Sequence, residues 1–110
     1  MTGVPIVTFA WLVFLTGAAF AGPLTTALDP RHGKELASGL CSNCHLVSGE
    51  QTQSNVDVPS FREIGRKEDQ TLDAIVARII LPKHPMPTIP LTKNELADIA
   101  SYILSLREEK

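Results

Sequence analysis

The chain has 110 residues, two cysteines and a formal net charge of −2 at pH 7. This length allows one domain at most. A weakly acidic chain has no basic stripe to neutralise phosphates, so nucleic acid is excluded as an expected partner.

Residues 1–21 form an uncharged, largely apolar segment that ends in the small-x-small triplet Ala19-Phe20-Ala21. This pattern predicts a secretory signal that is cleaved after the triplet. The segment lacks Lys and Arg and approaches the length of a membrane-spanning helix, so an uncleaved anchor remains the alternative. We expect an exported, periplasmic domain over 22–110, which contacts the membrane only if the segment is retained.

The expected domain is poor in large apolar groups. Phe61 and Tyr102 are its only aromatic side chains, and Met86 is its only methionine. A chain of this size has a marginal core, and a buried cofactor would supply the missing apolar surface.

The first predicted helix begins at Asp29-Pro30. Aspartate can cap a helix N-terminus, and proline suits the first helical position. Leu36, Ala37 and Leu40 give this helix an apolar edge that runs into a cysteine motif.

That motif is Cys41-Ser42-Asn43-Cys44-His45, the attachment pattern of a covalent c-type haem. Thiols one helical turn apart can reach the two vinyl groups on one edge of a porphyrin, and the adjacent histidine then lies beneath the iron. A redox dithiol, half of a zinc site and a disulfide are the alternatives for such a pair. A disulfide would close a loop too short to constrain much of the unfolded chain.

Two helices are predicted in the middle of the chain. Residues 60–63 have capping-box spacing and begin a short helix that stops near Gly65. A longer helix follows over 71–80, and Pro82 ends it. Its apolar face has helical spacing and consists of Leu72, Ile75, Val76, Ile79 and Ile80.

A stiff, proline-rich loop is predicted over 81–91, because its four prolines each fix a φ angle and remove an amide donor. Met86 lies between two of these prolines and not on an apolar helix face. Its thioether is therefore a candidate sixth iron ligand opposite His45, a pairing that favours ferrous iron. His84 and His32 are the rival distal ligands.

A second capping box at 92–95 begins a final helix that is expected to extend to about Arg107. Its buried stripe is expected to contain Leu96, Ile99, Ala100 and Ile103, with Tyr102 beside it. The chain shows no strand pattern and no internal repeat, so the expected fold class is all-α.

The order of these motifs resembles that of the small bacterial class I c-type cytochromes, the monohaem members of the cytochrome c family. The match runs from Leu28 to Leu106 and includes Cys41-Ser42-Asn43-Cys44-His45, Pro59-Ser60-Phe61, His84-Pro85-Met86-Pro87 and Ala100-Ser101-Tyr102-Ile103. The resemblance implies a small cytochrome c fold of about four helices around one covalently bound haem c.

The resemblance also implies a role for individual residues. Cys41 and Cys44 would form the thioether bonds, and His45 and Met86 would be the axial ligands. The carbonyl of Pro59 would accept a hydrogen bond from the ring N–H of His45, which would fix the orientation of that ligand.

Further contacts follow from the same resemblance. Phe61 is expected to lie against the haem. Gly33 and Ala37 of the first helix would meet Ile99 and Tyr102 of the last helix, where the two helices cross at a small residue.

Two features depart from the family pattern. Only 40 residues separate His45 from Met86, so the segment that covers the propionate edge in longer relatives is expected to be missing. No tryptophan remains after residue 21 to donate to a propionate. Arg78 or Lys83 is the expected substitute, with a solvated surface charge as the alternative.

The expected function is one-electron transfer through haem Fe(III)/Fe(II), with transient redox protein partners and no enzymatic activity. A haem subunit of a periplasmic dehydrogenase or oxidase is one alternative. An open-site haem that binds gas or catalyses a reaction is the other.

Overall fold

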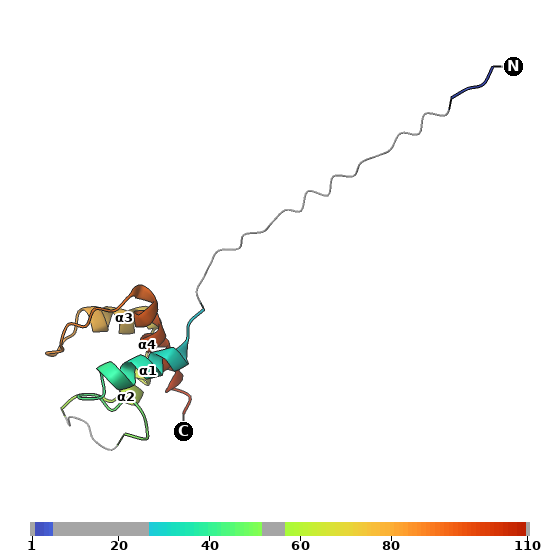
Figure 1. The fold of residues 1–110 in the computed structure, drawn as a ribbon. Coiled ribbons are helices and arrows are strands. Elements are labelled where there is room, and N and C mark those ends of the chain that lie inside the picture. The colour runs from blue at the N-terminus through green and yellow to red at the C-terminus, as the bar shows by residue number, and fades with distance from the viewer. Residues whose placement is uncertain (1, 6–26, 52–56, 110) are drawn as a thin grey trace.

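The computed structural model describes residues 2–5, 27–51 and 57–109. The predicted signal segment lies mostly outside these residues. The described part contains α1 (Pro30–Leu40), α2 (Phe61–Gly65), α3 (Leu72–Ile80) and α4 (Lys93–Ser105), and no strand (Figure 1). The all-α prediction is confirmed. None of the helices described is long and apolar enough to span a membrane.

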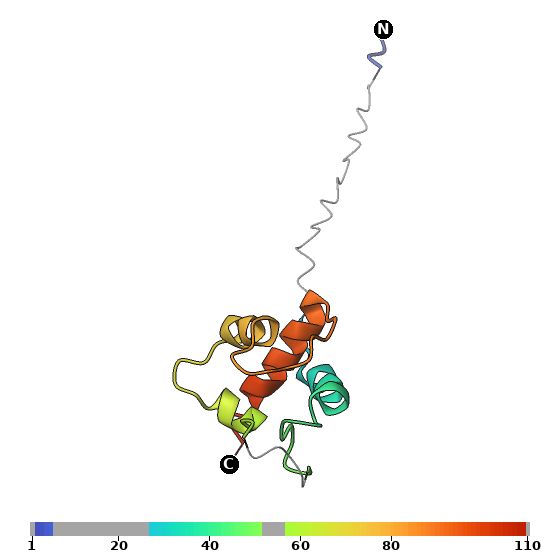
Figure 2. The same ribbon diagram turned by 90° about the vertical axis from the view of Figure 1, so that its left-hand side faces the viewer.

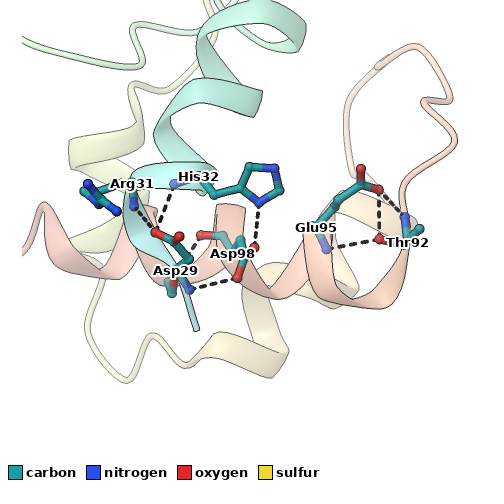
Figure 3. A network of polar contacts seen from close by, with 7 residues as sticks. Asp29, Arg31, His32, Thr92, Glu95 and Asp98 are labelled. Atoms are coloured by element: carbon teal, nitrogen blue, oxygen red, sulfur yellow. Dashed lines mark hydrogen bonds and ion pairs between the residues drawn. The ribbon is translucent and has the colours of Figure 1, made fainter. Parts of the chain in front are cut away.

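Each predicted cap begins a helix. The Asp29 side chain accepts hydrogen bonds from the first backbone N–H groups of α1. Ser60 and Glu63 form the predicted capping box of α2. Thr92 and Glu95 form that of α4 (Figure 3). These local bonds satisfy amides that have no partner within the helix.

Helix α4 is the centre of the fold, with α1 on one side and α2 and α3 on the other (Figure 2). Its predicted buried stripe is confirmed, and Ile99 and Ile103 are almost completely buried. The helix ends at Ser105, two residues before the predicted end. Beyond it, the Arg107 guanidinium donates to the carbonyl of Gly65 at 3.0 Å. The residues after α4 therefore contact the C-terminal end of α2.

Helices α1 and α4 cross at Gly33. A Cβ atom on this glycine would lie 2.0 Å from the carbonyl oxygen of Asp98 and 2.9 Å from the backbone nitrogen of Ile99. Only a residue without a side chain allows this approach, since the obstacle is backbone. Ala37, one turn further along α1, is fully buried. The predicted crossing of the first and last helices at small residues is therefore present.

A polar pair joins the same two helices. The Nδ1 atom of His32 lies 2.8 Å from Oδ2 of Asp98, whose Oδ1 accepts the backbone N–H of Asp29 at 2.9 Å (Figure 3). The hydrogen bond to Asp98 raises the pKa of His32, and the same bond lowers the pKa of Asp98. Each shift favours the charged form that its partner stabilises.

We expect this pair to make the stability of the holoprotein depend on pH. The raised pKa of His32 stabilises the fold at pH values below its ordinary 6.5, and this contribution disappears as pH rises through the raised value. The lowered pKa of Asp98 stabilises the fold above 3.8, and this contribution disappears as pH falls through the lowered value. The pair should therefore contribute most in the acidic range between these values.

Urea unfolding of the wild type and His32→Gln at about pH 5.5 and about pH 9 tests this expectation. The substitution should lower the midpoint at the acidic pH and have little effect at the alkaline pH. An equal loss at both pH values would contradict the charged pair.

Candidate functional site

A cavity of about 440 Å³ lies between α3, α4, the start of α2 and the proline-rich loop. Its volume is within the range of cofactor sites. Its apolar lining includes Ile64, Ile75, Ile79, Leu96, Ile99 and Ile103. Ile80, predicted on the apolar face of α3, is 58% exposed but also lines the cavity.

Most of the predicted site residues meet at this cavity. Cys41, His45, Pro59, Phe61 and Met86 line it. The exception is Cys44, which is exposed and is not among the lining side chains. Segments that are far apart in the sequence therefore contribute to one site.

The His45 ring has a fixed orientation. Its side chain is buried, and Nδ1 lies 2.7 Å from the carbonyl oxygen of Pro59. A carbonyl can only accept, so Nδ1 carries the proton and Nε2 of the neutral ring keeps a lone pair. The hydrogen bond predicted from the family resemblance is present, and the histidine is prepared to coordinate a metal through Nε2.

Phe61 supports the same histidine. The centroid of its ring lies 5.4 Å from that of His45, and its backbone N–H donates to the carbonyl of Leu46 at 3.0 Å. The first residue of α2 therefore holds the loop that carries the histidine and also lines the cavity.

The structure disfavours the other interpretations of the cysteine pair. No disulfide joins Cys41 and Cys44. Burial raises the pKa of Cys41, whereas the reactive cysteine of a redox dithiol has a lowered pKa. The described residues also contain no group of three or more His, Cys, Asp or Glu side chains that could hold a metal ion.

The two rival histidines lie in different places. His84 lines the cavity together with Met86, and the centroid of its ring lies 5.8 Å from that of His45. His32 is not a lining residue and pairs with Asp98 at the crossing of α1 and α4. His84 and Met86 are therefore the candidate ligands that the proline-rich loop presents to the cavity, and their positions alone do not distinguish between them.

Comparison with known proteins identifies the family. The sequence model of cytochrome c matches residues 31–107. The chain belongs to the cytochrome c family. It is 40% identical over 81 residues to cytochrome c-552 of Bradyrhizobium diazoefficiens, a match that covers 74% of the chain and 78% of that relative. It is 27% identical over 105 residues to cytochrome c6 of Rippkaea orientalis, covering 94% of each. No solved structure matches the chain significantly.

Membership of the cytochrome c family identifies the cofactor as one covalently attached haem c and the function as electron transfer. The cavity fits this group. Its lining is mostly apolar, as a porphyrin face requires, and it contains the imidazole of His45 and the thioether of Met86. Cys41 lines the cavity, and Cys44 follows one turn later, with its N–H 3.2 Å from the carbonyl oxygen of Cys41.

The charges at the cavity suit the two propionates of a haem. Lys67, Arg78 and Lys83 line it, and no carboxylate among the residues that the structure describes does so. Within the described residues, none of these three cations forms an ion pair. Arg78 and Lys83 are the cations expected from the sequence, whereas Lys67 was missed.

Sequence reasoning also missed Gln51. Its carboxamide forms hydrogen bonds with the loop that carries His45. A glutamine in a polar loop has no pattern that distinguishes it from a solvated side chain. The same applies to Lys67, which lies between α2 and α3 and lines the cavity.

Proposed function

We propose that the chain is a periplasmic one-electron carrier whose haem c is attached to Cys41 and Cys44 and coordinated by His45 and Met86. The observation that carries this proposal is the His45–Pro59 hydrogen bond of 2.7 Å, which leaves Nε2 of a buried imidazole as a ligand at the cavity. Cytochrome c membership supplies the haem, and the orientation of His45 at the cavity supports its proposed role as a ligand.

Met86 is preferred to His84 as the sixth ligand for two reasons. It is the only thioether in residues 22–110, and prolines on both sides restrict its backbone. A thioether opposite imidazole stabilises ferrous iron and raises the potential, which suits a carrier in an oxidising compartment.

When bound, the haem supplies the one-electron redox couple. The protein keeps the positions of the groups around the haem the same in both oxidation states. The Pro59 carbonyl fixes the ring of His45, and Pro85 and Pro87 fix the loop around Met86. The apolar lining excludes water from the centre of the site. Little rearrangement is then needed when the charge changes, which lowers the barrier to electron transfer.

The proposed partners are redox proteins that bind transiently at the cavity mouth. Ile80, which lines the cavity, is 58% exposed, and Leu81, the next residue along the chain, is 74% exposed. A weak redox encounter buries less than about 1,200 Å² in total. Export through the N-terminal segment would place the carrier in the periplasm, and retention of that segment would anchor it.

A redox titration combined with carbon monoxide binding tests this function. The purified holoprotein should titrate as a single one-electron couple, and its ferrous form should bind carbon monoxide slowly or not at all at neutral pH. Rapid binding by the wild type would instead indicate an open-site haem. Purification as a stable complex with a dehydrogenase or oxidase would indicate a dedicated subunit.

A further inference from the structure

Gln51 connects three backbone groups of the loop 42–47. Its Nε2 donates to the carbonyl of Ser42 at 2.8 Å and to that of His45 at 2.9 Å. Its Oε1 accepts the N–H of Val47 at 3.0 Å. One planar amide therefore holds both sides of the segment that contains the second cysteine and the histidine of the haem motif.

Other bonds hold this loop from outside. The hydroxyl of Tyr102 on α4 donates to the carbonyl of Val47, and the N–H of Phe61 donates to the carbonyl of Leu46. These bonds attach the loop to the core after His45. Gln51 is the side chain that bonds the backbone of His45 itself.

The two ends of His45 thus have separate anchors. Pro59 holds the ring through Nδ1, and Gln51 holds the main-chain carbonyl. With one anchor the ring can still rotate and tilt as its backbone moves. With both anchors the direction of Nε2 is set, because the side chain between them has only two rotatable bonds.

We propose that Gln51 is a positioning residue for the proximal ligand, which sets the orientation of the His45 ring through the main-chain carbonyl. This inference rests on the proposed role of His45 as an axial ligand. Partners beyond the metal-bound side chain commonly tune a metal site by fixing ligand orientation. Here the proposed partner acts on the backbone of the ligand, in addition to the Pro59 carbonyl that acts on its ring.

Two variants separate the donors of Gln51 from its acceptor. Gln51→Glu has the same shape and keeps an oxygen for the N–H of Val47, but loses both donors to Ser42 and His45. Gln51→Met has similar length and loses every hydrogen bond of the carboxamide without adding charge. Glu50→Gln is the matched control, because it changes one charge at the neighbouring position, where the Glu50 side chain is 87% exposed.

Electron paramagnetic resonance of the ferric holoprotein reports the orientation of the axial ligands, and the reduction potential reports their effect on iron. Both Gln51 variants should retain covalent haem but show shifted g values. Gln51→Met should also shift the potential, although it adds no charge. Amide exchange at Val47 should accelerate roughly tenfold in Gln51→Met and stay close to wild type in Gln51→Glu.

Unchanged g values and potential in both variants, with covalent haem intact, would overturn the positioning role and leave Gln51 as a loop-stabilising residue. An equal shift in Glu50→Gln, with none in Gln51→Met, would also overturn it, since local charge would then explain the effect. If Gln51→Met yields no holoprotein, the g values of the isosteric Gln51→Glu variant decide whether Gln51 positions His45. A wild type that lacks one-electron behaviour would contradict the proposed function itself, independently of these variants.

Discussion

Without its haem, the chain is expected to lose most of its helical structure. Four side chains of the hydrophobic core also line the cavity, namely Phe61, Ile75, Ile99 and Ile103. Without the haem, this apolar lining is left unfilled and open to water, and the burial of apolar surface is the main driving force of folding. Because a small domain has only about 5–15 kcal/mol of stability in total, the loss of these contacts is expected to unfold it.

Far-ultraviolet circular dichroism tests the dependence on haem. The comparison is between the holoprotein and the same chain, from Gly22 onwards, produced without haem attachment. The haem-free chain should show mostly disordered structure and no cooperative thermal transition. A fully helical haem-free chain that unfolds cooperatively would show that the protein core is sufficient by itself.

The helix boundaries were predictable because their determinants are local. Ser60 and Glu63 lie three residues apart, as do Thr92 and Glu95, so each capping box can be recognised in a short stretch of sequence. Pro82 likewise follows the end of α3 closely. Helix ends that depend on such short-range interactions can be predicted without knowledge of the tertiary packing.

The site was predictable where a motif carries the chemistry. Two thiols and a histidine at the spacing of Cys41, Cys44 and His45 indicate haem attachment without any knowledge of the fold. The Pro59 hydrogen bond was predicted only through the family resemblance, because it connects residues 14 positions apart.

Two side-chain contacts between distant residues could not be predicted. His32 and Asp98 lie 66 positions apart, and Arg107 bonds to Gly65 across 42 positions. From the sequence alone, His32, Asp98 and Arg107 cannot be distinguished from solvated surface charges. Their partners depend on how closely α1 and α2 approach α4. Gly33 and Gly65 permit this approach because they present no side chain to the α4 backbone.

Replacing Met86 by alanine is expected to open the iron to external ligands and to lower the potential, on the order of 0.1 V within the roughly 0.8 V range that axial ligands span. The loss of a soft sulfur ligand removes a preference for ferrous iron. The ferric sulfur-to-iron charge-transfer band should disappear. Cyanide binding to ferric protein and carbon monoxide binding to ferrous protein should both become rapid at neutral pH.

His84 supplies the control, because it lines the same cavity and its ring lies 5.8 Å from that of His45. His84→Ala should keep the charge-transfer band and the wild-type resistance to external ligands, since the thioether of Met86 stays in place. The double variant Met86→Ala/His84→Ala tests whether imidazole replaces the missing sulfur. If Met86→Ala stays closed and only the double variant binds cyanide, His84 occupies the sixth position once sulfur is removed. If the wild type lacks the band, or if the band survives in Met86→Ala, Met86 is not the ligand, because that absorption requires sulfur bound to ferric iron.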